Sequence, residues 1–188
     1  MTAKLRVGLV GAGPWAKMVH APMLAAGPET ELTGVWARRP EAAKELASAH
    51  GALVFDRYED LLANCDAVSF SVAPEAQAEL AAAAAAAGKP LLLEKPLAGS
   101  LADAERLARA VEEAGVPTML FLTSRFLDAA TSAVEGARAA EPFAARIAWV
   151  SGAFLPGSPF AFGWRLERGP LLDVGPHARD LALQLFGP

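Results

Sequence analysis

The stretch that decides the fold covers residues 4–16 and reads KLRVGLVGAGPWA. Its first seven residues are mostly apolar and partly β-branched, which is typical of a buried strand. Gly11 permits a tight turn, Gly13 lets a phosphate approach the main chain, and Ala16 allows close packing of helix on strand. Pro14 suits the first helical turn, where no amide donor is needed. The stretch therefore predicts a strand, a phosphate-binding turn and a helix in succession.

Strand-like and helix-like patterns alternate along the chain up to about residue 122. After the first strand, short apolar runs predict strands at residues 31–37, 53–55, 67–72, 91–93 and 117–122. Helices are expected at residues 14–26, 40–50, 60–63, 74–87 and 100–114. Ser100 suits the N-cap of the last helix, and Gly115 suits its end. A glycine-rich turn alone could be only a tight bend, but six strands that alternate with helices specify a parallel doubly wound sheet, where such a turn indicates dinucleotide binding.

The pattern changes after residue 122. We expect a helix at residues 128–140, a long strand at 143–154, a loop at 155–170 and a helix at 171–186. We therefore assign residues 1–122 to an α/β dinucleotide-binding Rossmann domain and residues 123–188 to the beginning of a second, α+β domain.

The composition is that of a globular protein. Of the 188 residues, 53% are hydrophobic and 20% are charged, which disfavours disorder. The net charge of -4 and the pI of about 5.4 disfavour nucleic-acid binding. Cys65 is the only cysteine, and no His, Asp or Glu cluster has metal-ligand spacing, so we expect neither a disulfide nor a metal site. The longest nearly uncharged apolar run, residues 80–88, is far shorter than the roughly 18 residues of a membrane span. The N-terminal apolar stretch is interrupted by glycines and has no cleavage pattern, so it reads as a core strand rather than a signal peptide, and we expect a cytoplasmic protein.

The end of the second predicted strand bears on the choice of cofactor. NAD sites usually carry an acidic residue there, about 20 residues after the turn, which binds the ribose 2′-hydroxyl. Residues 36–39 read WARR and contain no carboxylate. Arg38 and Arg39 suit the 2′-phosphate of NADP, although they could also be a solvated pair that starts the next helix. We therefore expect NADP(H), with NAD(H) possible.

Glu94, Lys95 and Pro96 follow the fifth predicted strand. Ligands of open α/β sheets bind outside the carboxyl ends of the strands. A lysine at such an end can exchange a proton with a substrate hydroxyl. The alternative is that Glu94 and Lys95 form an ordinary surface pair.

Asp173 and His177 are a further candidate pair. If Asp173 begins a helix, His177 lies one turn later on the same face, and the two can form an oriented acid–base couple. A single histidine on a helix is more often structural, so the spacing alone leaves both interpretations open.

Together these features resemble the family of glucose–fructose oxidoreductase and inositol dehydrogenase, the Gfo/Idh/MocA oxidoreductases. The resemblance extends through the whole chain. It rests on residues 11–16, 20–24, 88–90, 94–97, 125–126, 164–165 and 169–180.

The resemblance implies roles for individual residues. Lys95, Asp173 and His177 are the implied catalytic residues, and they would face the nicotinamide. The implied substrate contacts are Lys95, Arg125, Trp164, Arg165 and His177. The implied cofactor contacts are Gly11, Gly13, Pro14, Trp15, Ala16, Arg38, Arg39, Pro74, Glu94 and Lys95.

The same resemblance implies a reaction. The substrate would be a secondary alcohol of a sugar or cyclitol, or the matching ketone, and the complete protein is expected to be a homo-oligomer. Two alternatives stay open: a reductase of a non-sugar ketone or unsaturated ring, and a dinucleotide-binding regulatory protein without catalysis.

The chain departs from the family pattern in two respects. Relatives often carry a histidine where this chain has Gln77, which puts the substrate class in doubt. Family members also continue well beyond the point where this sequence ends, so the second domain is expected to be truncated, with a naturally short form as the alternative. His20, on the first helix, is expected to serve packing rather than ligand binding.

Overall fold

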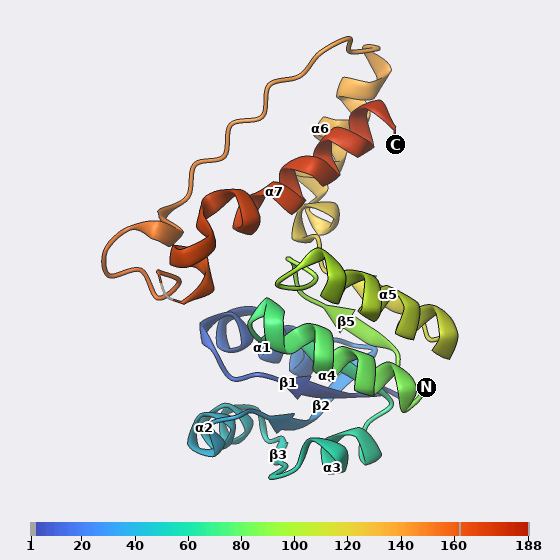
Figure 1. The fold of residues 1–188 in the computed structure, drawn as a ribbon, viewed down its shortest axis with the longest axis vertical. Coiled ribbons are helices and arrows are strands. Elements are labelled where there is room, and N and C mark those ends of the chain that lie inside the picture. The colour runs from blue at the N-terminus through green and yellow to red at the C-terminus, as the bar shows by residue number, and fades with distance from the viewer. Residues whose placement is uncertain (1–2, 162, 188) are drawn as a thin grey trace. The chain divides into compact units, whose positions relative to one another are not determined.

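The computed structural model describes residues 3–161 and 163–187. The chain divides into two compact units, Met1–Leu120 and Phe121–Pro188 (Figure 1). The first unit contains the sheet with its helices, and the second contains helices and irregular segments.

The first unit is built on a sheet of six parallel strands, in the order β3-β2-β1-β4-β5-β6. Their bounds are β1 Leu5–Val10, β2 Thr30–Trp36, β3 Leu53–Val54, β4 Ala67–Phe70, β5 Leu91–Leu93 and β6 Thr118–Leu120. This confirms the predicted doubly wound sheet. The strand order reverses between β1 and β4, and the carboxyl ends of these two strands flank the crevice in which such folds bind ligands.

Helices connect successive strands of the first unit. They are the π-helix Ala16–His20 with α1 Ala21–Ala26, then α2 Pro40–His50, α3 Tyr58–Ala63, α4 Pro74–Ala86 and α5 Leu101–Ala114. One apolar core joins α1 and α2 to β1 and β2, and a second joins α3, α4 and α5 to β4 and β5. Figure 1 shows α4 and α5 side by side. Ala81, Ala84 and Ala85 of α4 are buried in the same apolar core as Leu107 of α5, and their small side chains allow close packing.

Local signals set several helix ends in the first unit. Ser100 Oγ accepts a hydrogen bond of 3.1 Å from the Asp103 amide, as expected of the predicted N-cap. Gly115 ends α5 in the left-handed conformation. The helical segment predicted from residue 14 to 26 is present, but its middle turn is the π-helix Ala16–His20, which is buried at Ala16 and His20. Single π-turns inside helices are frequent at functional sites.

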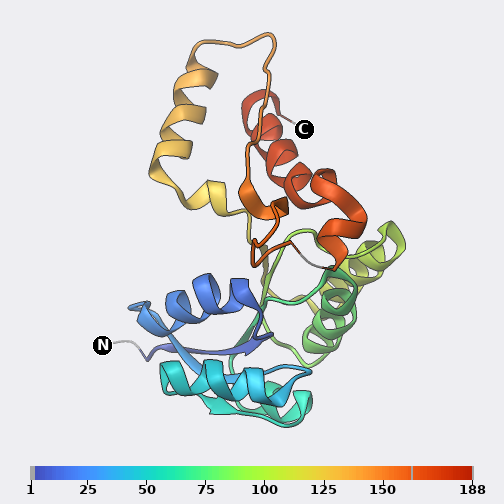
Figure 2. The same cartoon turned by 90° about the vertical axis from the view of Figure 1, so that its left-hand side faces the viewer.

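The second unit begins with a 3-10 turn, Thr123–Phe126, and α6, Asp128–Ala139. The strand predicted at residues 143–154 is wrong. Both views show an open stretch after α6 (Figures 1 and 2), which leads to a short 3-10 turn at Gly152–Phe154. Alternating side chains favour an extended chain, but a strand also needs a neighbour for its main-chain hydrogen bonds. Among the residues that the structure describes, no strand lies against this one.

The last helix, α7, covers Trp164–Phe186 and contains a break at Gly169, whose φ is 77° and ψ 178°. The loop predicted at residues 155–170 is therefore wrong for its last part, because Trp164–Arg168 is already helical. Pro170 lacks an amide hydrogen and begins the second segment of α7, which matches the helix predicted from residue 171. Across the described residues, no helix is long and apolar enough to cross a membrane.

Candidate functional site

The glycine-rich turn joins β1 to the first helix as predicted. Gly11 has a φ of 113°, and a Cβ at this position would lie 2.2 Å from the carbonyl oxygen of Ser71. The Gly11 amide donates to the carbonyl of Trp36 over 2.8 Å. Only glycine fits here, since the turn is held between the ends of β2 and β4. A Cβ at Gly13, by contrast, would meet nothing within 4 Å, so Gly13 borders open space.

A cavity of about 370 Å³ opens at this turn. Its lining combines the turn, the first helix and the loop after β2, and consists of Ala12, Gly13, Pro14, Lys17, Met18 and Arg39. The main chain at Gly13 is open, and the side chains of Lys17 and Arg39 lie beside it. This arrangement suits a pyrophosphate and a further phosphate. A dinucleotide therefore fits the residues present.

The cavity distinguishes among the predicted cofactor contacts. Gly13, Pro14 and Arg39 line it, whereas Arg38 is exposed on the same loop. Sequence reasoning missed Lys17, whose ammonium also bonds Glu45 Oε1 over 2.8 Å. Its signal was the position of a cation one turn after Pro14. The ring of Pro74 is buried as the first residue of α4.

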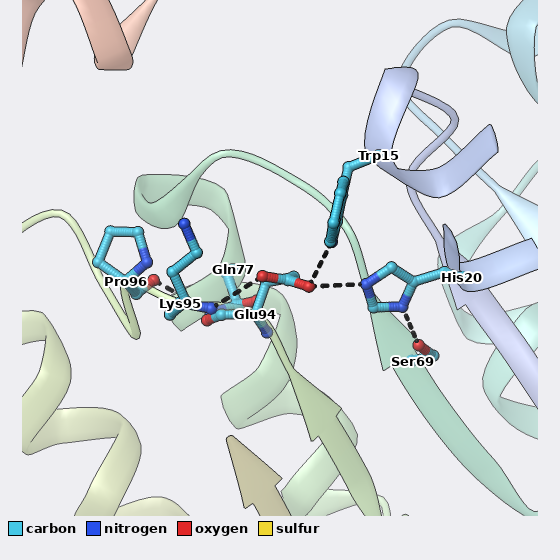
Figure 3. Close-up of polar contacts among 7 residues, drawn as sticks. All are labelled: Trp15, His20, Ser69, Gln77, Glu94, Lys95 and Pro96. Atoms are coloured by element: carbon cyan, nitrogen blue, oxygen red, sulfur yellow. Dashed lines mark hydrogen bonds and ion pairs between the residues drawn. The ribbon is translucent and has the colours of Figure 1, made fainter. Parts of the chain in front are cut away.

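Glu94 lies at the carboxyl end of β5 and is buried, with 7% of its surface exposed. Its Oε1 accepts a hydrogen bond of 2.6 Å from Trp15 Nε1 and lies 2.9 Å from His20 Nε2 (Figure 3). Its Oε2 accepts the amide of Lys95 over 3.1 Å. The alternative of a surface Glu94–Lys95 pair is therefore wrong, because this carboxylate is held by groups from the first helix and from its own turn.

Gln77 holds the main chain of the same turn. Its amide nitrogen donates to the carbonyls of Glu94 over 2.7 Å and of Leu97 over 3.0 Å, and its Oε1 accepts the Glu94 amide over 2.8 Å. The side chain is 1% exposed. Its polar atoms therefore serve the backbone of residues 94–97, and the bearing of Gln77 on the substrate class stays a prediction.

In the second unit, Asp173 and His177 lie on one buried face of α7, one turn apart as predicted. Arg165 Nε donates to Asp173 Oδ1 over 3.2 Å, and the same guanidinium lies 4.8 Å from the ring centre of Trp164. The imidazole of His177 stacks on Trp149, with ring centres 5.3 Å apart and planes 14° apart. Sequence reasoning missed Trp149, because a contact 28 positions away along the chain leaves no local signal.

Arg125 and Asp180 form an ion pair within this unit. The guanidinium donates to Asp180 from Nε over 2.9 Å and from Nη2 over 2.6 Å, and Gln184 donates to the same carboxylate over 2.8 Å. The hydrogen bonds to Asp180 raise the pKa of Arg125. The guanidinium implied to bind substrate is thus held by Asp180, and it links the 3-10 turn to α7.

The structure brings together two groups of candidate residues. Trp15, Glu94 and Lys95 belong to the first unit, and Asp173 and His177 belong to the second. Their catalytic roles stay predictions. Within the described ranges, no group of three or more His, Cys, Asp or Glu side chains could hold a metal ion.

Known proteins share both the sequence pattern and the fold. The chain is 32% identical to the dTDP-3,4-didehydro-2,6-dideoxy-alpha-D-glucose 3-reductase of Streptomyces violaceoruber, over 97% of this chain and 55% of the reductase. GenD2 from gentamicin A biosynthesis, solved in complex with NAD, matches all of this chain and 55% of its own with a TM-score of 0.79 and 27% identity. KijD10, a 3-ketoreductase from Actinomadura kijaniata solved with NADP, matches 71% of this chain and 43% of its own, with a TM-score of 0.66 and 30% identity.

The chain spans about half the length of the reductase and of GenD2. A family model described as an oxidoreductase family with an NAD-binding Rossmann fold matches residues 5–121. This chain belongs to the Gfo/Idh/MocA oxidoreductase family.

Proposed function

We propose that the chain is the cofactor-binding part of an NADP(H)-dependent oxidoreductase whose substrate is a secondary alcohol of a sugar or cyclitol-like molecule, or the matching ketone. The observation that carries the proposal is the turn at Gly11–Gly13, with its cavity and two cations, at the point where the strand order reverses. The sugar reductase and the 3-ketoreductase among its relatives support the substrate class.

The residues of this chain would divide the work as follows. Gly13, Lys17 and Arg39 would hold the phosphates of the dinucleotide. The bound nicotinamide supplies hydride exchange with the carbinol carbon. Lys95 Nζ would exchange the proton of the substrate hydroxyl, because Lys95 follows the carboxyl end of β5, where ligands of such sheets bind. The family resemblance gives His177 the role of relaying or sharing a proton and Asp173 that of orienting and charging the pair, and both roles remain predictions. The homo-oligomer and the cytoplasmic location remain predictions.

The preference for NADP(H) rests on Arg39, which lines the cavity, and on Arg38 beside it. Loss of one charge-assisted contact to a phosphate costs about 1.5–3 kcal/mol, or roughly 10- to 100-fold in affinity. Arg39→Ala should therefore weaken NADPH binding by this factor, and Arg38→Ala by a similar or smaller one. NADH binding should change little, which titration of both cofactors measures. Tighter binding of NADH than of NADPH by the unmutated protein would contradict the preference.

The reaction is tested with NADPH and a panel of sugar, cyclitol and non-sugar ketones and alcohols. In the complete protein, Lys95→Met should lower turnover on the best substrate by at least about 100-fold, because a positioned acid or base contributes roughly 10²–10⁴-fold. His177→Ala should lower it by an equal or smaller factor. Both variants should still bind NADPH. Nearly full turnover by Lys95→Met would remove Lys95 from the mechanism.

A further inference from the structure

Behind the Glu94–Lys95–Pro96 turn lie three buried polar side chains that the proposed reaction does not use. His20 and Ser69 are 0% exposed and Gln77 is 1% exposed. Burial of polar groups is costly unless they are hydrogen-bonded. Here His20 bonds Ser69 and the Glu94 carboxylate, and Gln77 bonds the main chain of the turn (Figure 3).

Gln77 determines the path of the main chain. It bonds the Glu94 carbonyl and amide and the Leu97 carbonyl, so it holds the turn on both sides of Lys95. Since the side chain starts on α4, it ties the turn to a helix that is packed on the sheet. The main chain at Lys95, from which its side chain extends, is therefore held in place.

His20 determines the orientation of the Glu94 carboxylate. Nε2 faces Glu94 Oε1 over 2.9 Å, and Nδ1 faces Ser69 Oγ over 2.8 Å, so the imidazole is held at both ends. Next to a carboxylate, Nε2 is the donor in this contact. Trp15 Nε1 donates to the same Oε1, which leaves Oε2 directed at the Lys95 amide.

The order Ser69, His20, Glu94 has the connectivity of the triad of serine hydrolases. A nucleophile must reach its substrate, however, and Ser69 has no exposed surface. The geometry therefore supports a scaffold rather than a second reaction.

We infer that His20 and Gln77 are positioning residues for Lys95: Gln77 fixes the main chain of the turn, and His20 fixes the carboxylate that accepts the Lys95 amide. Their role in catalysis rests on the proposed function, because it assumes that Lys95 exchanges the proton. Displacement of a reacting group by about 1 Å can lower a rate by roughly 100-fold, so a loosened turn should act on turnover more than on cofactor binding.

The first experiment measures the position of the Glu94 carboxylate by NMR and needs no enzymatic reaction. The indole NH of Trp15, identified with Trp15→Phe, and the amide of Lys95 both bond Glu94, so their resonances in a ¹H–¹⁵N spectrum report the carboxylate. His20→Leu should shift both. His20→Gln should restore them toward the unmutated positions, because a glutamine amide can donate from about the position of Nε2. Unchanged resonances in a folded His20→Leu protein would overturn the inference.

The second experiment measures turnover of the complete protein with NADPH. His20→Leu and Gln77→Leu should lower kcat by about 10- to 100-fold and leave the Kd for NADPH within about twofold, and His20→Gln should recover most of kcat. The matched control is Tyr58→Phe, which removes another buried hydrogen bond, from Tyr58 to the Leu80 carbonyl, and should lower the Tm with kcat unchanged. Unchanged kcat in folded His20→Leu and Gln77→Leu proteins would overturn the catalytic role.

Two further outcomes are decisive. If His20→Leu fails to fold, the comparison of His20→Gln with His20→Asn replaces it, since the shorter asparagine cannot reach Glu94 and should lower kcat; equal kcat in the two would overturn the inference. If the unmutated protein binds NADPH but turns over no substrate, the proposed function fails, and the two resonances alone decide whether His20 positions the turn.

Discussion

Tyr58 illustrates how one buried polar side chain links stability to pH. Its hydroxyl donates to the Leu80 carbonyl over 2.7 Å, and its ring lies 5.3 Å from that of Trp36. It is 7% exposed, and this burial raises the pKa of its hydroxyl well above the usual value. The folded state thus binds the phenolic proton more tightly than the unfolded state does. The stabilisation is present below the unfolded pKa of about 10 and is lost as the pH rises above it.

We therefore expect the free energy of unfolding to fall as the pH rises from about 9 to 11. Tyr58 is the only tyrosine, so the phenolate absorbance band reports its ionisation, and the phenolate should appear together with unfolding. Tyr58→Phe should flatten the decline. A smaller decline should remain, because burial also raises the pKa of Cys65. Ionisation of Tyr58 in the folded protein near pH 10 would contradict the expectation.

At the scale of elements, the turn between β1 and the first helix contains two glycines with different roles. Gly11 is required by the backbone, since its positive φ and the Ser71 carbonyl leave no room for a Cβ. Gly13 is not required by the fold, since a Cβ there meets nothing within 4 Å. A glycine that the fold does not need is best explained by the approach of a ligand.

The two glycines form a matched pair of tests. Gly11→Ala should lower the free energy of unfolding by at least about 1–3 kcal/mol, because alanine is strained at this φ. Gly13→Ala should leave the Tm within error and weaken NADPH binding by about tenfold or more, since the added methyl would stand between the turn and a phosphate. Thermal unfolding and fluorescence titration measure both. Full NADPH affinity in Gly13→Ala would place the cofactor elsewhere.

At the scale of the whole molecule, the two units differ in how their side chains are covered. The first contains both apolar cores. In the second, α6 has no buried residue among those described, and Phe143 and Val150 of the extended segment are 101% and 98% exposed. Such a segment opens without loss of buried apolar contacts, and proteases cut where the backbone opens most easily.

Trypsin should therefore cleave first at Arg146, which is exposed in the extended segment. Arg109 is the internal control, because it lies in α5, and cleavage there requires the helix to unwind first. Mass spectrometry of a time course should show the Arg146 products well before those of Arg109. Equal rates at the two sites would show that the extended segment is protected.

Sequence signals that act within a few positions predicted much of the architecture of the first unit. The strand at residues 91–93 and the helix at 40–50 match their predicted bounds, because apolar runs, Pro40 and Gly51 act within a few positions. The turn at Gly11 and the cap at Ser100 were predictable for the same reason. The strand expected at residues 143–154 was not, because alternation shows only that a segment can be a strand, and pairing depends on a neighbour elsewhere in the chain.

By itself, the sequence determined the order of elements in the first unit, the parallel sheet, the phosphate-binding turn and the spacing of Asp173 and His177. Tertiary structure alone decided which polar groups meet. Gln77 contacts Glu94 across 17 positions, Arg125 contacts Asp180 across 55, and His20 contacts Glu94 across 74. The physical reason is the range of the forces: backbone preferences and capping act over one turn, whereas a buried side chain bonds whatever group the packed elements place within about 3 Å.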